Sequence, residues 1–297
     1  MDSIYIFLFY TFRFFIKYSP SFISNALLNF LSYIGYTLDK KHRKIARVNL
    51  DLAYENRLSY IEKENIIKSC YKNIIYNLAD FVKNQASTRE EILSKVVFKN
   101  EHFLQDALNN NRKIIVQTAH YGNWELLSLS IAAKFSSVSV VGRDLDSAVM
   151  NEILTKNREQ FDIELISKYG AMKGMMKALK LGRALGVLVD QNTSDKEGLL
   201  IDFFGKQARH TPSVAILARK FDAIIIPAFI KTYDFKKYEV CFYEPIEMNS
   251  SDDKEKDIFE CVQKQADITQ KIIEEKPDEW FWLHQRWKNK YEGLYNA

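Results

Sequence analysis

A histidine and a glutamate, His120 and Glu125, stand five residues apart just after the apolar stretch 114–116. This stretch is typical of a buried strand, and a histidine oriented by a carboxylate at a strand exit is suited to act as a general base. The same pair also fits a packed turn histidine and an ordinary first-turn helix acid, which the helix dipole favours. The segment alone favours neither interpretation.

A second polar cluster, Asp190 and Gln191, follows another apolar stretch, residues 184–189. Two strands that both end in polar residues indicate one site built along a single edge of a sheet.

Strand-like and helix-like segments alternate along the chain. Strands are expected at 95–98, 113–118, 137–141, 163–166, 184–189, 224–229 and 238–243, and helices at 42–85, 101–110, 146–161, 171–180, 212–221 and 252–275. This alternation predicts an α/β fold with a mostly parallel central sheet flanked by helices.

The composition is that of a globular or membrane-associated protein. The 297 residues are 47% hydrophobic, and no Pro/Gly/Ser-rich linker divides them. The net charge of +4 is too small to indicate nucleic-acid binding, and no such partner is expected. Three scattered cysteines favour a reducing compartment.

The N-terminus is unusually apolar and aromatic. Residues 4–16 are almost wholly apolar apart from Arg13, residues 22–38 form a milder apolar stretch, and a basic cluster follows at 40–47. Basic residues beside apolar helices attract anionic lipid. Residues 1–38 are therefore predicted to be a membrane anchor, either interfacial or one tilted span, and residues 39–297 the catalytic domain. A very aromatic core helix is the alternative.

The sequence lacks the motifs that mark several common kinds of enzyme chemistry. A Gly-rich phosphate loop and GxGxxG are absent, so no nucleotide cofactor is expected. HExxH and CxxC are missing too, so no metal site is expected, and without GxSxG there is no nucleophile elbow. His120 would then activate a hydroxyl of the substrate itself.

Five blocks along the chain carry a family resemblance. They are a basic segment at 43–50, residues 119–125 with an HxxxxE pattern, Asp190-Gln191, a segment containing Phe203-Phe204-Gly205, and a Trp-rich block at 280–288. Arg143 and Arg158 fall between them. In these blocks the chain resembles the late acyltransferases of lipid A biosynthesis, the lauroyl/myristoyl transferase family. This resemblance implies a glycerol-phosphate-acyltransferase-like fold with N-terminal membrane-anchoring helices.

The resemblance implies acyl transfer from an acyl carrier protein to the hydroxyl of a 3-hydroxyacyl chain on a lipid IVA-type precursor. His120 is expected to be the general base, with Glu125 bound to its other ring nitrogen as in a triad. Backbone N–H groups of Gly122 and Asn123 are candidate oxyanion donors. Substrate binding is assigned to Arg158, Asp190, Arg143, Asn123 and Gln191; Arg158 would contact a phosphate or the oxyanion, and Asp190 would position Arg158 or a sugar hydroxyl.

The implied setting is the inner membrane of a Gram-negative bacterium, with membrane lipids as partners and the active site facing the cytoplasm. Residues 40–47 are a candidate surface for the acidic carrier. His284 and Arg286 are assigned structural roles, while His42, His102 and His210 are expected on the surface. Two alternatives stay open: a related membrane acyltransferase acting on a lysophospholipid or another glycolipid, and a non-catalytic membrane scaffold of the same fold.

Overall fold

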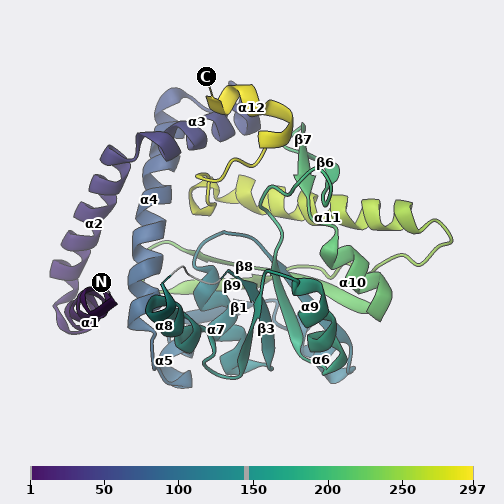
Figure 1. Cartoon of the computed structure of the whole chain (residues 1–297), viewed down its shortest axis with the longest axis horizontal. Helices are drawn as coiled ribbons and strands as arrows, with labels where there is room; N and C mark the ends of the chain where they lie inside the picture. The colour runs from purple at the N-terminus through teal and green to yellow at the C-terminus, as the bar shows by residue number, and fades with distance from the viewer. Residues whose placement is uncertain (1, 144–146, 297) are drawn as a thin grey trace.

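A seven-stranded sheet forms the centre of the computed structural model, which describes residues 2–143 and 147–296 (Figure 1). The strand order is β1-β9-β8-β2-β5-β3-β4. Strands β8, β2, β5, β3 and β4 are mutually parallel, whereas β9 and β1 run the opposite way at one edge. The bounds are β1 Val96–Lys99, β2 Lys113–Thr118, β3 Val138–Gly142, β4 Ile163–Ser167, β5 Ala184–Leu188, β8 Ala223–Thr232 and β9 Tyr238–Phe242. The predicted mostly parallel α/β fold is confirmed.

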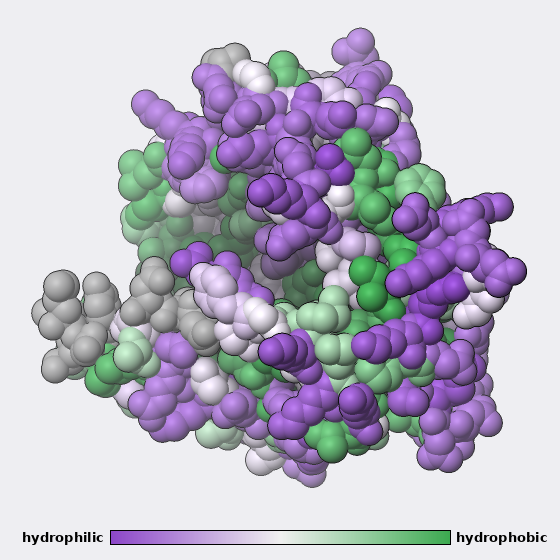
Figure 2. Space-filling model, turned by 45° about the vertical axis from the view of Figure 1, so that its right-hand side comes forward, coloured by the Kyte–Doolittle hydropathy of each residue, from purple (hydrophilic) through white to green (hydrophobic). Residues whose placement is uncertain are grey.

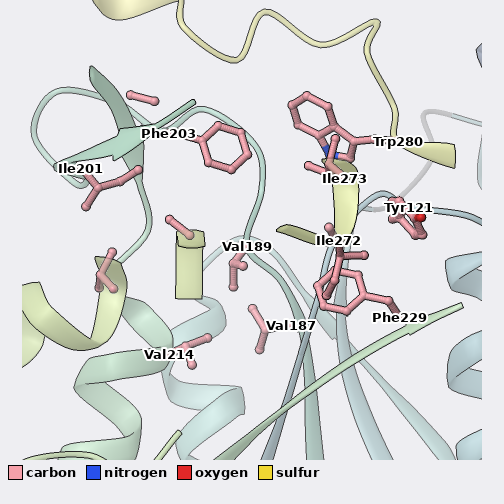
Figure 3. Packing of buried hydrophobic residues seen from close by; sticks show 14 of the residues in the cluster. Tyr121, Val187, Val189, Ile201, Phe203, Val214, Phe229, Ile272, Ile273 and Trp280 are labelled. Carbon is pink, nitrogen blue, oxygen red and sulfur yellow. The ribbon is translucent and has the colours of Figure 1, made fainter. Parts of the chain in front are cut away.

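Helices cover both faces of this sheet, because its central strands are apolar on both sides. One face packs against α5 (Arg89–Leu93), α6 (His102–Asn109) and α7 (Trp124–Lys134). The other face packs against α9 (Ala171–Lys180), α10 (Ser213–Phe221) and α11 (Lys254–Glu275). Figure 3 shows part of this second core, in which Val187 and Val189 of the β5 segment meet aliphatic and aromatic side chains from α10, α11 and the C-terminal segment.

The first four helices of the chain lie along one side of the sheet, where α8 (Ala148–Arg158) joins them (Figure 1). Their bounds are α1 Asp2–Tyr18, α2 Ser21–Leu38, α3 Lys40–Tyr54 and α4 Tyr60–Lys83. Within the described ranges, no helix is both long and apolar enough to cross a membrane. A spanning version of the predicted anchor is therefore not supported. The α1–α2 pair nevertheless exposes many aromatic rings, among them Phe7, Phe14, Tyr18, Phe22, Phe30 and Tyr33.

Two departures from the expected elements have local causes. The helix predicted over 42–85 is two helices, because Glu55 takes a positive φ of 49° and Ser59 starts α4 with a capping box to Glu62. A hairpin of β6 (Leu199–Phe203) and β7 (Lys206–His210) was not predicted. Its two turn residues, Phe204 and Gly205, both have positive φ, as tight hairpin turns require.

The last described elements are a short 3₁₀ helix, Pro277–Glu279, and α12 (Lys288–Asn296).

Candidate active site

The two polar strand ends come together because β2 and β5 are parallel neighbours. Their register pairs Thr118 with Leu188, and His120 and Asp190 each follow two residues later. The sheet thus brings these two side chains to the same carboxyl edge, where α/β proteins bind their ligands. The two polar strand ends therefore lie together at one sheet edge, as expected from the sequence, and their role as a functional site stays a prediction.

His120 and Asp190 are bound directly to each other. Nδ1 of the imidazole lies 2.9 Å from Oδ1 of Asp190, and the backbone N–H of His120 donates to Oδ2 at 3.1 Å. Oδ2 also accepts the indole N–H of Trp280 at 2.8 Å. Burial alone would raise the pKa of Asp190, but the His120 charge and these hydrogen bonds outweigh it and hold that pKa below its ordinary value. Asp190 is therefore a buried carboxylate that keeps its charge.

The expected contact between Glu125 and His120 was wrong. Glu125 lies in the first turn of α7 and instead makes a two-pronged ion pair with Arg158 of α8. Nε of Arg158 donates to Oε2 at 2.9 Å, and Nη2 donates to Oε1. The fork of a guanidinium matches both carboxylate oxygens. Asp190 thus takes the position beside His120 that Glu125 was expected to hold, and Glu125 holds Arg158.

The second ring nitrogen of His120 faces open space and Gln191. When Nδ1 carries the proton and donates to Asp190, Nε2 keeps its lone pair, which the Gln191 side-chain amide meets at 3.3 Å. The imidazole packs beside the rings of Trp124 and Phe281, whose centroids lie 5.2 and 6.2 Å from its own. The pair therefore presents one basic nitrogen, in a defined direction, at an aromatic-walled opening.

This opening leads into a cavity of about 1050 Å³. His120, Glu125, Arg158 and Gln191 line its polar part. Much of the remaining wall is aliphatic, from strands and from helices α7, α9 and α10: Val116, Leu127, Ile131, Val138, Val140, Met172, Met175 and Ile216. In Figure 2 the molecule is hollowed, with apolar side chains within the recess and polar ones along much of its border. The cavity has the size and character needed for a long apolar chain with a polar end.

Glycine is required in the turn that carries His120. Gly122 has a positive φ of 56°, and a Cβ there would meet the carbonyl oxygen of Ile230 at 1.9 Å. Its N–H donates to the carbonyl oxygen of Glu279 at 3.0 Å. This N–H is therefore already engaged, contrary to the expectation that it serves as an oxyanion donor.

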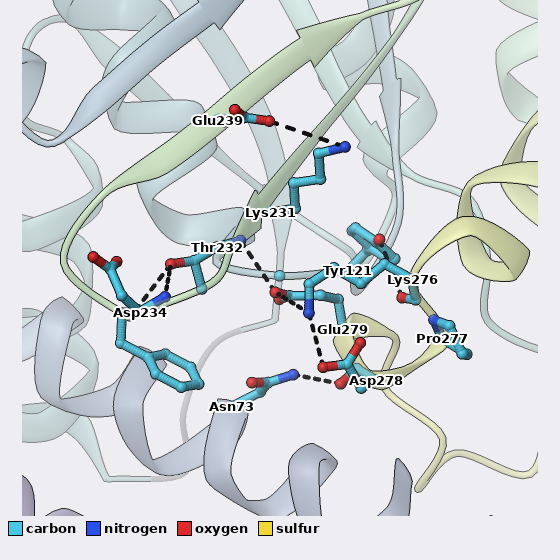
Figure 4. A network of polar contacts seen from close by, with 12 residues as sticks. Asn73, Tyr121, Lys231, Thr232, Asp234, Glu239, Lys276, Pro277, Asp278 and Glu279 are labelled. Carbon is cyan, nitrogen blue, oxygen red and sulfur yellow. Dashed lines mark hydrogen bonds and ion pairs between the residues drawn. The ribbon is translucent and has the colours of Figure 1, made fainter. Parts of the chain in front are cut away.

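The C-terminal segment holds this turn in place. The N–H of Phe281 donates to the carbonyl oxygen of His120 at 2.9 Å, and Glu279 accepts from the backbone N–H of Thr232 at 3.1 Å (Figure 4). Lys276 forms an ion pair with Glu279 and with Asp278. Burial raises the pKa of Glu279 despite this ion pair. The residues around 276–281 thus tie the His120 turn to β8.

Residues 1–289 match the family of bacterial lipid A biosynthesis acyltransferases. The chain belongs to this family. A lipid A biosynthesis lauroyltransferase of Escherichia coli (strain K12) is 23% identical, over 86% of this chain and 82% of that protein. The palmitoleoyltransferase of the same organism is 21% identical, over 86% and 81%. A lipid A biosynthesis acyltransferase of Haemophilus influenzae is 18% identical, over 88% and 80%.

A solved structure is also similar, that of a 1-acyl-sn-glycerophosphate acyltransferase from Thermotoga maritima. It shares 16% identity with a TM-score of 0.36, over 83% of this chain and 97% of that one. Together with the family match, the named relatives make this chain an acyltransferase of lipid A biosynthesis.

The predicted substrate-binding residues of the acyltransferase do not all lie on the cavity wall. Arg158, Arg143 and Gln191 line the cavity, but Asp190 lies behind His120. The Asn123 side chain is turned away from the cavity: it is 2% exposed, caps α7 through Leu126 and donates to Asp80. Its expected role in substrate binding is replaced by a structural one. In the described part of the chain, no cluster of three or more His, Cys, Asp or Glu residues is arranged to hold a metal ion.

Sequence reasoning missed the part that the C-terminal block plays in the site. The tryptophans of this block were expected to be core or interface residues; Trp280 is buried, yet its indole also binds the Asp190 carboxylate. His284, also part of this block, accepts the backbone N–H of Asn192 at 3.0 Å, just after Gln191. His210, expected on the surface, is 1% exposed and lies against the buried Arg286. The only available signal was the density of polar and aromatic residues in 280–288.

Proposed function

We propose that this acyltransferase moves a fatty acyl chain from an acyl carrier protein thioester to the hydroxyl of a 3-hydroxyacyl chain on a lipid IVA-type precursor. The observation that carries the proposal is the orientation of His120. Asp190 holds one ring nitrogen, and the other faces a large cavity with an aliphatic wall. A base directed into an acyl-sized space is what attack by an aliphatic hydroxyl requires.

In the first step, the acceptor hydroxyl displaces the Gln191 side-chain amide as the hydrogen-bond partner of His120 Nε2. Nε2 takes the proton as the hydroxyl oxygen attacks the thioester carbonyl carbon. The buried Asp190 carboxylate stabilises the imidazolium that results, 2.9 Å away. When the tetrahedral intermediate collapses, the C–S bond breaks and Nε2–H returns the proton to the carrier thiolate. The products are an ester and a free thiol.

This scheme needs no acyl-enzyme. The described hydrogen bonds of the His120 ring go to Asp190 and Gln191, and neither of these is a hydroxyl or thiol that the histidine could activate for covalent catalysis. The displaced Gln191 amide is free to donate to the oxyanion of the tetrahedral intermediate.

Arg158 supplies positive charge in the polar part of the cavity. Two of its nitrogens bind Glu125, and the guanidinium borders the cavity. We assign Arg158 to a phosphate of the acceptor or to the developing oxyanion, because a guanidinium binds both well. Glu125 then acts as a positioning residue for Arg158.

The α1–α2 pair provides a way to reach a membrane-bound acceptor. Its exposed rings include Phe14, 67% exposed, and Phe22, 73% exposed. Aromatic side chains of this kind favour the boundary between lipid and water. We propose that these helices lie on the surface of the inner membrane, which corresponds to the interfacial form of the predicted anchor.

Mass spectrometry of lipid A tests the proposed reaction. A cell that lacks this protein is expected to make lipid A that is short of one secondary acyl chain, and expression of the normal chain should restore it. Expression of His120→Ala at equal abundance should not. Intact lipid A together with an altered phospholipid profile would instead support an acyltransferase of lysophospholipids.

Purified enzyme separates catalysis from a scaffold role. Wild type should transfer a labelled acyl group to the acceptor, and His120→Ala should fold but lose nearly all turnover. Normal turnover by His120→Ala would disprove the general-base assignment. After incubation with donor alone, the denatured protein should carry no label; a stoichiometric acyl-enzyme would require a two-step mechanism.

A further inference from the structure

An unusually basic surface borders the cavity on α9. Residues 165–189 contain four lysines and one arginine but no Asp or Glu, in a chain with 42 basic and 38 acidic residues. Arg183 is held by Asp162 and Glu164. The four lysines, Lys168, Lys173, Lys177 and Lys180, are all exposed. The charges of these four lysines are therefore presented to solvent, whereas that of Arg183 is used within the fold.

Lys220 extends this surface from the neighbouring helix α10. Its ammonium group lies 3.4 Å from Sδ of Met176 on α9, and it too is exposed. None of these five lysines forms an ion pair with a carboxylate of the described residues. Together with the exposed Tyr169 and Leu181 at the two ends of α9, they form what we call the α9 surface.

Helix stability does not explain the arrangement of these charges. Lys177 and Lys180 lie in the last turn, where the helix dipole favours cations. Lys173, however, lies near the start of α9, where a cation is disfavoured, and it faces the like charge of Lys177 four residues on. No acid occupies the first turn. The position of Lys173 is therefore not explained by helix stability, and it is understandable if an anionic partner neutralises this charge.

The α9 surface is continuous with the cavity. Lys168 lines the cavity, as do Ala171, Met172 and Met175 on the adjoining part of α9. A partner seated on the lysines would therefore hold its acyl chain at the entrance of the aliphatic space. Residues 40–47, the surface expected from the sequence, contribute nothing to the cavity wall, and Arg47 there is paired with Glu64.

We propose that the α9 surface docks an acidic protein that carries the acyl donor as a thioester, an inference that rests on the proposed function. Charge complementarity identifies the partner as acidic, and continuity with the cavity identifies it as the donor's carrier. A membrane is disfavoured as the occupant, because the exposed aromatic helices α1 and α2 lie well away from α9 (Figure 1). The α9 surface itself offers only Tyr169 and Leu181 for insertion.

Charge reversal on α9 tests the docking. Lys173→Glu/Lys177→Glu in the full chain is compared with Lys264→Glu/Lys271→Glu, which reverses two exposed lysines, seven residues apart, on α11. Fluorescence anisotropy measures the Kd for labelled acyl carrier protein. The α9 variant should bind at least tenfold more weakly, and the α11 variant should stay within twofold of wild type. Raising the ionic strength should weaken wild-type binding more than binding by the α9 variant.

Two donors with the same acyl chain provide the kinetic measurement. With acyl carrier protein, the α9 variant should show a KM at least tenfold higher at similar kcat. With the uncharged acyl-pantetheine thioester, its kcat/KM should stay within twofold of wild type. An equal loss with both donors, unchanged carrier binding, or no carrier binding by wild type would overturn the docking proposal.

The outcomes also separate docking from the reaction. Tight carrier binding that depends on α9, without turnover from either donor, would refute the proposed function and leave the docking surface intact. A loss confined to binding of phosphatidylglycerol vesicles, with normal carrier kinetics, would assign the α9 surface to the membrane and refute the carrier proposal.

Discussion

Replacing Asp190 with Asn distinguishes the dyad of the structure from the one that the sequence suggested. Asp190 is 3% exposed, and its Oδ1 lies 2.9 Å from Nδ1 of His120. Two unit charges about 4 Å apart attract by about 4 kcal/mol when the effective dielectric constant is about 20. Because about 1.4 kcal/mol changes a rate tenfold, losing the attraction between the carboxylate and the imidazolium should lower kcat about a thousandfold. The Asn amide can also donate to Nδ1, which would place the histidine proton on the wrong nitrogen and deepen the loss.

Glu125→Gln is the matched variant. It makes the same acid-to-amide change in the other carboxylate of the site and leaves an amide oxygen that can still accept from Arg158. Because Glu125 acts through Arg158, we expect a fall in kcat of roughly 10- to 100-fold. If Glu125 were the partner of His120, as the sequence suggested, the two variants would exchange their effects.

Steady-state kinetics with a saturating carrier donor measure both variants alone and in combination. Asp190→Asn should cost little more once His120 is already Ala, because both changes remove one unit. Glu125→Gln should couple to Arg158→Lys but not to Asp190→Asn. The dyad assignment is refuted if Asp190→Asn keeps more than a tenth of wild-type kcat while its fold, checked by circular dichroism, is unchanged.

Three further predictions concern residues around this pair. Trp280→Phe removes one hydrogen bond to a buried carboxylate, a contribution of about 2 kcal/mol, so kcat should fall roughly 30-fold. The control is Trp282→Phe, because the Trp282 indole donates to Pro277; it should change kcat less than about threefold. Equal losses in the two variants would deny Trp280 a positioning role. Ile131 lies seven residues, about 10 Å, along α7 from Trp124 and lines the cavity. In competition between acyl donors, Ile131→Phe should shift the preference toward shorter acyl chains and Ile131→Ala toward longer ones. An unchanged preference would mean that the acyl chain does not lie against Ile131. Burial, followed by the charge of Arg286, lowers the pKa of His210 to about 3; since the unfolded histidine binds its proton near pH 6.5, the contribution of neutral His210 is complete above pH 6.5 and up to about 5 kcal/mol of unfolding free energy is lost as the pH falls toward 3. Urea unfolding from pH 7 to 4 should therefore show a shallower dependence on pH in His210→Gln than in wild type, and equal slopes would contradict this account.

The strands of the sheet could be predicted because their signal is local. Each central strand is an apolar run between polar residues, and the strand expected at 113–118 forms over those residues. The β6–β7 hairpin escaped because it is short, and because one of its two turn positions with positive φ is a phenylalanine, Phe204. Turn chemistry of that kind is invisible when a bulky residue replaces the usual glycine or asparagine.

Partners in the site could not be read from spacing, because contacts follow strand order rather than distance along the chain. Glu125 is five residues from His120, yet α7 carries it to Arg158 of α8. Asp190 is seventy residues from His120, and it becomes the neighbour only because β5 lies next to β2 in the sheet.

Trp280 shows a further limit of sequence reasoning. A tryptophan in an aromatic block is expected in a core or an interface, but a buried tryptophan still needs a partner for its N–H. Here that partner is the Asp190 carboxylate. The C-terminal block, whose backbone also binds the His120 turn through Phe281, thus holds the acid and the base of one site from a distance of ninety residues or more in the chain. Trp280 is therefore a core residue by its burial, and its hydrogen bond also fixes a side chain of the candidate site.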